Sequence, residues 1–293
     1  MKRANSKTVV SNGSDKATAI SFLLQSIAPR CMPGWPRPEQ LIIYDAKGDA
    51  LPILACMGLQ AEDPNVWLLS PFDSRCAVWD LGEAATSLSM ARQLATLLVR
   101  EEKMSCAPYF SDAARYLIYA VILGLNRQLG EHWSLHDLIH ALDARNRSAA
   151  IAAMELRAAS VVAAIMEDDE KFSGRVISTL AANIGRFEEV AARWHNVRGN
   201  KRFSISSFLR RPGVLVLGSD PVLKDSIWSI NAMVLQALAN EILRGPAANL
   251  PRHWFVLDEF QATGQLDCVQ DLLNRGRSKG ASVLFDTQGV PGL

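Results

Sequence analysis

The segment Trp254-Phe255-Val256-Leu257-Asp258-Glu259 decides the fold class of this chain. Four apolar residues ahead of two carboxylates are typical of a buried strand that brings acidic side chains to the end of a sheet. In nucleoside triphosphatases this arrangement, the Walker B pattern, places the first carboxylate near Mg²⁺ and the second near the attacking water. A buried strand that ends in two surface acids gives the same pattern, so other segments must distinguish the two interpretations.

A Walker B strand predicts a phosphate-binding loop earlier in the chain. The candidate is Val9-Val10-Ser11-Asn12-Gly13-Ser14-Asp15-Lys16-Ala17-Thr18, between a predicted strand at Thr8–Val10 and a predicted helix at Ala19–Ile27. Lys16 stands where the GxxxxGK(S/T) motif has the lysine that contacts the β- and γ-phosphates. An ordinary strand-to-helix turn is the competing interpretation of this segment.

Three positions of the candidate loop depart from the motif. Val10 and Asp15 replace glycines that let backbone N–H groups surround phosphate, and Ala17 replaces the hydroxyl that binds Mg²⁺. At an effective dielectric constant of about 20, a carboxylate about 5 Å from a phosphate charge costs about 3 kcal/mol. Thr18 supplies the missing hydroxyl only if the loop shifts by one residue.

Short apolar runs rich in β-branched residues predict buried strands, and amphipathic patterns predict helices between them. The predicted strands are Thr8–Val10, Leu41–Tyr44, Val66–Leu69, Gly213–Leu217, Trp254–Leu257 and Ala281–Phe285. The long stretch between the third and fourth strands has helical patterns only, at Ala84–Val99, Ser111–Leu129, Ser134–Leu142, Ser148–Met166 and Ser173–Trp194. Ser134 together with Asp137 predicts the start of one of these helices.

The order of these elements predicts an α/β fold with a mostly parallel sheet, interrupted by an all-α insertion. We expect residues 1–89 and 200–293 to form the two parts of the α/β domain, and residues 90–199 to form the insertion. A basic, glycine-containing segment at Arg198–Arg202 marks the end of the insertion.

Composition restricts the class of protein further. The 293 residues include 31 Lys and Arg and 30 Asp and Glu, so a generic cationic nucleic-acid coat is excluded and any DNA contact is local. With 49% hydrophobic residues the chain can bury a large core.

The longest uncharged run, Ser226–Asn240, is too short for a membrane span. Scattered cysteines without a CxxC pair favour reduced thiols in a cytoplasmic setting; they are Cys31, Cys56, Cys76, Cys106 and Cys268.

Several segments accompany the Walker B strand in a specific order. They are the loop at 9–18, Leu41-Ile42-Ile43-Tyr44-Asp45-Ala46-Lys47-Gly48-Asp49, Ser70-Pro71-Phe72-Asp73-Ser74-Arg75-Cys76-Ala77-Val78-Trp79, Arg277-Ser278-Lys279-Gly280 and Asp286-Thr287-Gln288. In this order the chain resembles the type IV coupling proteins, the TraD/TrwB-like ATPases of conjugation and type IV secretion in the FtsK/HerA superfamily. The likeness also includes Glu170–Ser173, Phe203–Ile205 and Gly218–Ile230, and so covers nearly the whole chain.

The resemblance implies a RecA-like P-loop NTPase domain that holds the all-α domain as an insertion. It also implies a site for ATP and Mg²⁺ in which each matching residue has a role. The phosphates are expected on Gly13, Ser14, Lys16 and Thr18, the metal on Asp258, and the attacking water on Glu259.

Two further residues match catalytic positions of the family. Arg277 stands where an arginine finger enters the nucleotide site of the neighbouring subunit, and Gln288 stands where the γ-phosphate is sensed. Such a finger neutralises charge that develops on the transferred phosphoryl group. Taken alone, each of the two residues is better explained by the plain interpretation, a solvated arginine at a helix end and a strand-terminal glutamine in a turn.

The implied function is that of the core of a coupling ATPase. In the family a homo-oligomeric ring, a hexamer, translocates DNA or relaxase-bound DNA towards the type IV secretion channel, from the cytoplasmic side of the inner membrane. Family members begin with transmembrane helices and continue beyond the region matched here, so we expect this chain to be a family core without its ends. The departures at Val10, Asp15 and Ala17 leave open an alternative, a catalytically silent adaptor that recruits secretion substrates without hydrolysing ATP.

Two other patterns have a functional and a plain interpretation. His136 and His140 have the spacing of zinc ligands on a helix, but a surface helix explains them without a third ligand. The basic stretch Arg193–Arg202, with Trp194 and Phe203 nearby, suits either DNA phosphates with an aromatic platform or an inter-domain linker.

Overall fold

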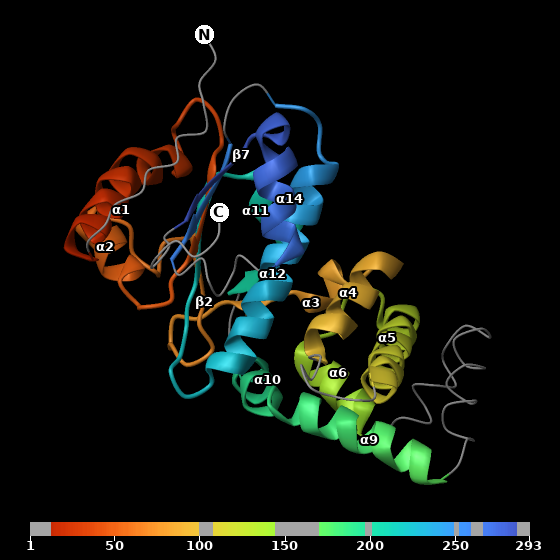
Figure 1. Cartoon of the computed structure of the whole chain (residues 1–293). Helices are drawn as coiled ribbons and strands as arrows, with labels where there is room; N and C mark the ends of the chain where they lie inside the picture. Colours follow the sequence, from red (N-terminus) through yellow and green to blue (C-terminus); the bar gives the residue numbers. More distant parts are fainter. Residues whose placement is uncertain are drawn as a thin grey trace.

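The computed structural model describes residues 13–99, 108–143, 170–196, 201–248, 252–258 and 266–285. The predicted strand at Thr8–Val10 and the predicted helix at Ser148–Met166 lie outside these ranges, as do Glu259 and Gln288. An all-parallel sheet forms the centre of the fold, and helices cover both of its faces (Figure 1).

The five strands of the sheet agree with the sequence predictions to within one residue at each end. They are β1 (Gln40–Tyr44), β2 (Val66–Leu69), β5 (Gly213–Leu217), β6 (His253–Leu257) and β7 (Ala281–Phe285). Their order in the sheet is β2-β5-β1-β6-β7, and every neighbouring pair is parallel. Their apolar, β-branched composition suits a sheet that is buried on both faces.

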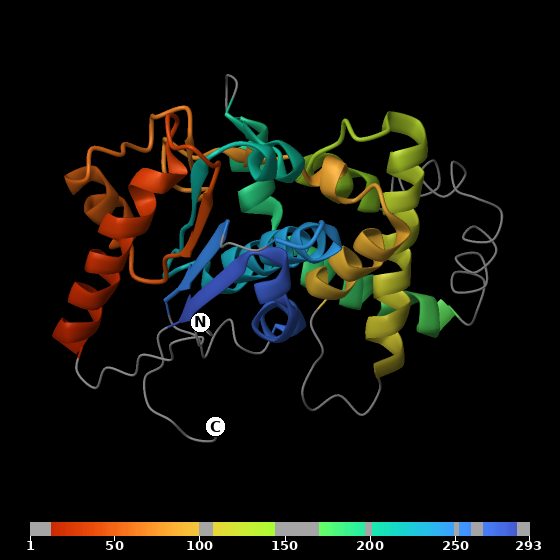
Figure 2. The same cartoon turned by 90° about the horizontal axis from the view of Figure 1, so that it is seen from above.

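Alternate residues of the strands enter two separate hydrophobic cores, because successive side chains of a strand point to opposite faces. Leu41 and Ile43 of β1 face the smaller core, under helices α1 (Gly13–Ile27) and α2 (Ala50–Cys56). Ile42 and Tyr44 face the larger core, where α12 (Lys224–Arg244) and α14 (Asp267–Arg275) pack. Figure 2 shows α1 and α2 on one side of the sheet and the remaining helices on the other.

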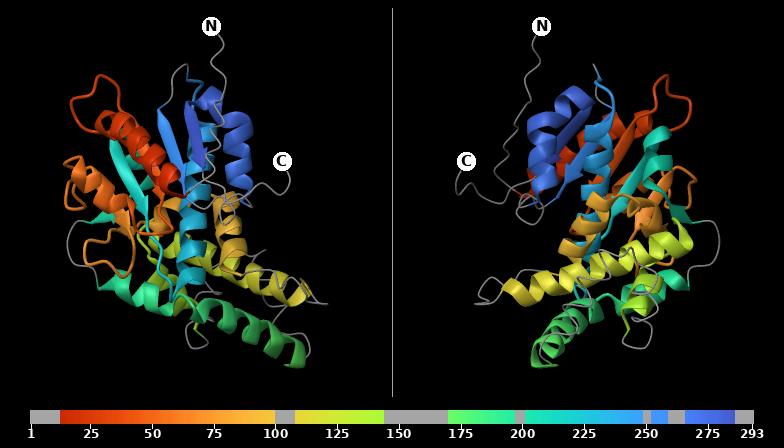
Figure 3. Two further views of the ribbon diagram at one scale, coloured as in Figure 1. Left: turned by 60° about the vertical axis from the view of Figure 1, so that its left-hand side comes forward. Right: turned by 90° about the vertical axis from the view of Figure 1, so that its right-hand side faces the viewer.

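The helices of the inserted region form a bundle beyond the carboxyl ends of the strands (Figures 1 and 3). They are α3 (Leu81–Ala84), α4 (Leu88–Leu98), α5 (Pro108–Leu129), α6 (Leu135–Leu142), α9 (Glu170–Gly185) and α10 (Glu188–His195). Their buried side chains belong to the same core as the α12 face of the sheet. The insertion therefore packs on the α/β domain through one continuous apolar interior.

The chain enters and leaves the inserted region at one place. The short strands β3 (Val78–Trp79) and β4 (Arg202–Phe203), which the sequence did not predict, pair in parallel. Helix α11 (Ile205–Arg210) follows β4 and leads into β5. This pair closes the insertion, because the bundle helices α3 to α10 lie between the two strands along the chain.

Several predicted helix boundaries were wrong, among them the start of the helix predicted at Ser111–Leu129, which begins at Pro108. The helix predicted at Ala84–Val99 is two helices, because the Ser87 side chain accepts from the Met90 N–H and caps the start of α4. The helix predicted at Ser173–Trp194 is also two, since α9 ends at Gly185 and α10 begins at Glu188. The first helix begins at Gly13, earlier than the predicted Ala19.

The predicted start of α6 was correct. Ser134 and Asp137 form a capping box, in which each side chain accepts from the other residue's backbone N–H. None of the helices in the described ranges is long and apolar enough to cross a membrane.

Candidate functional site

The candidate site lies at the carboxyl edge of the sheet, between the neighbouring strands β1 and β6. The chain passes from β1 through α2 on one face of the sheet, and from β6 through α14 on the other. The two connections also lead in opposite directions, since β2 and β7 lie at opposite ends of the sheet. A parallel sheet opens a crevice for ligands where connections diverge in this way.

Two oppositely charged side chains meet at this edge of the sheet. The ammonium Nζ of Lys47, in the turn after β1, lies 3.1 Å from Oδ1 of Asp258, the residue that follows β6. The Asp258 side chain is 17% exposed and that of Lys47 is 45% exposed. The Asp258 carboxylate is therefore held near the protein surface and already has one cation beside it.

Asp45 builds the turn that carries Lys47. This buried carboxylate accepts from the backbone N–H groups of Gly48, Asp49 and Ala50, at 2.8, 3.1 and 3.0 Å. It thereby holds the turn between β1 and α2 and satisfies the N–H of Ala50, the first residue of α2, and Gly48 takes the left-handed conformation (φ 84°) that the turn requires. Burial raises the pKa of the Asp45 carboxyl, and the nearby charge of Asp258 raises it further, while these hydrogen bonds act in the opposite direction.

Arg277 lies at the opposite edge of the sheet. It belongs to the short 3₁₀ helix η2 (Gly276–Lys279), which directly precedes β7, whereas Asp258 directly follows the paired strand β6. A strand rises about 3.3 Å per residue, so β7 alone separates the two edges by about 16 Å. The Arg277 side chain is exposed, and its guanidinium makes no hydrogen bond or ion pair with the residues that the structure describes.

The residues predicted to hold phosphate lie in a helix in this structure. Gly13, Ser14, Lys16 and Thr18 all belong to α1, so the expected loop over these positions was wrong. Helix α1 ends near the amino ends of the strands, where Arg30 binds Glu39 just before β1. Its first turn therefore points towards the carboxyl edge, the edge that carries Asp258.

The histidine pair of the insertion shows no metal geometry. The rings of His136 and His140 are stacked with centroids 6.2 Å apart, and the His195 ring of α10 stacks on His136 at 4.1 Å. Within the described ranges, no group of three His, Cys, Asp or Glu side chains is arranged to hold a metal ion.

Burial raises the pKa of Cys76 to about 11 and of Cys268 to about 12, so these thiols stay protonated.

Comparison with known proteins adds to this geometry. A family model described as the type IV secretion-system coupling protein DNA-binding domain matches residues 4–291. The chain belongs to this family. A search of curated proteins gives no match.

Solved structures of one coupling protein share the fold. The unbound monoclinic form of the bacterial conjugative coupling protein TrwBdeltaN70 is 18% identical, with a TM-score of 0.68 over 93% of this chain and 59% of that one. The plasmid coupling protein TrwB in complex with the GTP analogue GDPNP is 18% identical, and its complex with ADP and Mg²⁺ is 17% identical. Both have TM-scores of 0.70 over 97% of this chain and 68% of the other. The RecA-like fold with an all-α domain is therefore confirmed, and the chain spans 59% to 68% of these TrwB chains.

The Asp258 carboxylate, which pairs with Lys47 at the carboxyl edge of the sheet, has the chemistry of a ligand for a divalent cation. A carboxylate is a preferred ligand of Mg²⁺, and Lys47 shows that the site accepts a positive charge at hydrogen-bonding distance from that carboxylate. Neither Lys47 nor Asp45 was among the predicted site residues. The signal that marks them is an Asp-x-Lys-Gly turn after a buried strand, since such a turn lies at the ligand edge of a parallel sheet.

Proposed function

We propose that this chain is the nucleotide-binding and all-α core of a type IV coupling ATPase. The observation that carries the proposal is the contact between Lys47 and Asp258 at the carboxyl ends of β1 and β6, where the connections that follow the two strands leave the sheet on opposite faces. In the proposed complex, Asp258 holds Mg²⁺ and the start of α1, with Lys16, lies against the phosphates. Mg²⁺ bound to ATP would neutralise phosphate charge during hydrolysis.

The residues of this chain divide the remaining tasks in the proposal. Glu259 orients the attacking water and Gln288 contacts the γ-phosphate, as the family resemblance implies; both lie outside the described residues. Arg277 serves a neighbouring copy of the chain, because it lies at the edge of the sheet opposite to Asp258. A site completed by the next subunit couples hydrolysis to assembly in a ring, and we propose a hexamer.

In the family context, the proposed substrate is DNA or a relaxase–DNA complex that is passed to a type IV secretion channel at the inner membrane. The family model is described as a DNA-binding domain, and the solved structures that share the fold are those of a conjugative and plasmid coupling protein. The bundle lies beyond the carboxyl edge of the sheet, so a substrate held there lies near the nucleotide site (Figure 1).

A silent adaptor is the second candidate, and the start of α1 favours it. The helix begins at Gly13, so the segment that is expected to surround phosphate is already helical at Ser14 and Lys16. Together with Asp15 and Ala17, this arrangement favours a protein that keeps the coupling-protein fold to recruit substrates without ATP hydrolysis.

Subunit complementation tests the proposed ATPase. Arg277→Ala keeps the metal site but loses the finger, and Asp258→Ala keeps the finger but loses the metal site. Each variant alone is expected to be inactive. An equimolar mixture is expected to regain about a quarter of the wild-type ATPase rate, because about one subunit interface in four then joins an intact Asp258 to an intact Arg277. If the wild type hydrolyses ATP and the mixture stays inactive, the proposed role of Arg277 is wrong. If wild-type assemblies do not hydrolyse ATP at all, the adaptor is the better account.

A further inference from the structure

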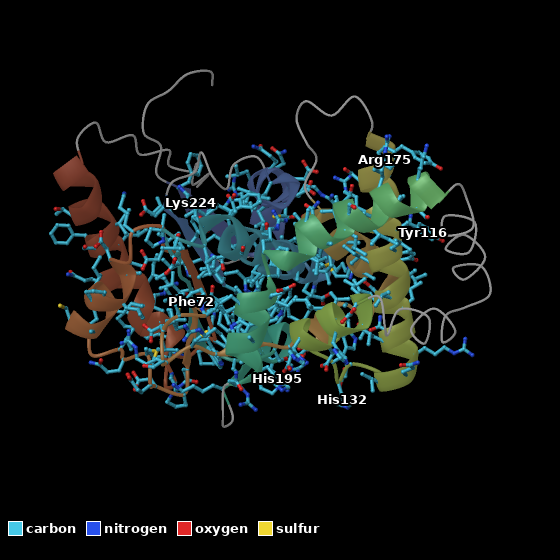
Figure 4. The ribbon with its side chains drawn as sticks, turned by 90° about the horizontal axis from the view of Figure 1, so that it is seen from below. Phe72, Tyr116, His132, Arg175, His195 and Lys224 are labelled. Atoms are coloured by element: carbon cyan, nitrogen blue, oxygen red, sulfur yellow. The ribbon has the colours of Figure 1, made fainter. Side chains whose placement is uncertain are left out.

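A second site lies at the junction between the sheet and the helical bundle. An open hollow of about 750 Å³ lies between the loop after β2 and helix α10. Phe72 and Asp73 line it from the loop, Glu189 and Arg193 from α10, and Asn196 from the end of that helix. Lys201 lines it from the segment before β4. Figure 4 shows Phe72 on the sheet side and His195, at the end of α10, on the bundle side.

An aromatic ring and a guanidinium form the wall of this hollow. The Arg193 guanidinium carbon lies 5.2 Å from the centre of the Phe72 ring. Phe72 is half-buried and packs against the large core, so its ring position is set by the fold. A guanidinium stacked on a ring gives a flat, positively charged surface on which another planar group can stack.

The two carboxylates that line the hollow, Asp73 and Glu189, are paired with arginines to different extents. Asp73 is fully engaged by Arg75, which donates from Nε at 2.9 Å and from Nη2 at 2.7 Å; this pairing lowers the pKa of the Asp73 carboxyl. Glu189 approaches Arg193 only to 3.9 Å, and both side chains are more than half exposed. Such a pair is weak in water. Arg193 is therefore available to an anionic ligand.

Lys201 adds a second cation at the same wall. Its ammonium donates one hydrogen bond, of 3.3 Å, to the carbonyl oxygen of Arg75, and it is exposed. Asn196, one turn along α10 from Ala192, offers an exposed amide whose Nδ2 already donates to the Ala192 carbonyl. The hollow thus combines a stacking surface, two cations and an amide oxygen that accepts hydrogen bonds.

We propose that the hollow binds single-stranded DNA, with a base stacked on the Phe72 and Arg193 pair and the adjacent phosphate on Lys201. Aromatic stacking with cationic side chains along the backbone is how proteins hold single strands without reading their sequence. A duplex keeps its bases stacked on one another, so it cannot use this surface. The proposal rests on the proposed DNA-transfer function and gives it a location.

The hollow lies at the same edge of the sheet as the proposed nucleotide site but does not overlap with it. The loop after β2 lies at the carboxyl edge of the sheet, as Asp258 does, but three strands away in the order β2-β5-β1-β6. With neighbouring strands about 4.8 Å apart, the two positions are separated by about 14 Å across the sheet. A strand of DNA in the hollow therefore leaves the crevice at Asp258 free.

The test measures binding of a fluorescent oligothymidine and of a labelled duplex by anisotropy, over a series of salt concentrations. Phe72→Leu keeps an apolar side chain but removes the ring, and is expected to weaken single-strand binding at least fivefold without changing the salt slope. Lys201→Gln is expected to weaken binding and to lower the salt slope by about 0.7, because it removes the phosphate contact. Arg193→Gln is expected to weaken single-strand binding because it removes the guanidinium from the stacking surface. None of the three is expected to change duplex binding.

Arg244→Gln is the matched control. Arg244 also lies on a helix beside a glutamate, Glu241, and is 54% exposed against 58% for Arg193. Its substitution changes the net charge equally and should leave single-strand binding unchanged. The two surface variants, Arg193→Gln and Lys201→Gln, keep the test valid if Phe72→Leu unfolds.

The outcomes separate this inference from the proposed function. If the wild type binds the oligothymidine and all three variants bind it equally well, the site is wrong but DNA transfer stands. If Arg244→Gln has the same effect as Arg193→Gln, only net charge matters and the site is again wrong. If the wild type binds neither DNA form, both the site and the proposed handling of DNA are overturned.

Discussion

Nζ of Lys47 lies 3.1 Å from Oδ1 of Asp258, and this contact joins the ends of two neighbouring strands that are 211 residues apart in the sequence. It places a cation on the carboxylate proposed to hold Mg²⁺. The turn that carries Lys47 is itself held by the buried carboxylate of Asp45. We therefore expect Lys47 to act on the proposed metal site and Asp45 on the stability of this edge of the sheet.

Substitution of Lys47 and of Asp45 should separate these two roles. Lys47 is 45% exposed, so we expect Lys47→Met to change the free energy of unfolding by less than about 1 kcal/mol. Asp45→Asn removes a charged acceptor of three N–H groups, so a loss of about 1–3 kcal/mol is expected. Urea unfolding followed by circular dichroism measures both. A larger loss for Lys47→Met than for Asp45→Asn would contradict this account of the turn.

The imidazole of His253, the first residue of β6, should make stability depend on pH. Burial, and to a lesser extent the charge of Arg252, lowers its pKa from 6.5 to about 4. Between these values the unfolded chain binds a proton that the folded chain does not, so the free energy of unfolding falls as pH falls from 6.5 towards 4. At 1.36 kcal/mol per pKa unit, the loss is at most about 3 kcal/mol.

His253→Gln should remove this part of the pH dependence. Its control is His132→Gln, because His132 is exposed (Figure 4). We expect the control to keep the wild-type profile between pH 4 and pH 6.5, measured by urea unfolding at each pH. Identical profiles for His253→Gln and the wild type would refute the assignment.

Two glycines should respond oppositely to alanine. A Cβ on Gly82 would lie 2.4 Å from the carbonyl oxygen of Glu131 and 2.8 Å from that of Trp133, both backbone atoms. Gly82→Ala is therefore expected to destabilise the fold by more than about 2 kcal/mol. Gly174 lies inside α9 with nothing within 4 Å of its Cβ position, so Gly174→Ala should stabilise by about 0.5–1 kcal/mol. Thermal unfolding distinguishes the two, and melting temperatures that shift in the same direction would be inconsistent with the packing of α3.

A buried charge anchors the amino edge of the sheet. Glu39, 3% exposed, accepts from Arg30 at 2.6 Å and from the Trp254 indole at 2.8 Å, and Arg30 also lies over the Trp254 ring. Arg30→Met leaves this carboxylate with one partner fewer, at an expected cost of about 1–3 kcal/mol. In a double-mutant cycle with Glu39→Gln, we expect a coupling energy of at least about 1 kcal/mol. Additive losses would mean that the pair contributes nothing.

The strands were predictable from the sequence because their information is local. Runs such as Gly213–Leu217 are apolar on both faces, and that pattern requires burial in a parallel sheet. The all-α insertion followed from the absence of such runs between Val66–Leu69 and Gly213–Leu217. Helix ends were less predictable, because Ser87 ends one helical pattern and caps the next helix within the same amphipathic stretch.

The contacts of the two sites depend on tertiary structure, which no local pattern encodes. Lys47 meets Asp258 only because β6 inserts beside β1, although β2 and β5 come between them in the chain. Phe72 likewise meets Arg193 only once the insertion has folded back onto the loop after β2. The sequence motifs therefore indicated Asp258 and the basic stretch Arg193–Arg202, but not Lys47 or Phe72, with which they make contact.

The binding of Mg²⁺ with ATP tests the central claim most directly. Isothermal titration of ATP into the chain, with and without Mg²⁺, should be compared with titration into Asp258→Ala and into the Asp15→Gly/Ala17→Thr variant. We expect micromolar affinity that requires Mg²⁺, a loss of at least about tenfold in Asp258→Ala, and tighter binding in the double variant. No binding by the wild type and by the double variant, or equal affinity in Asp258→Ala, would contradict a nucleotide site at this edge of the sheet.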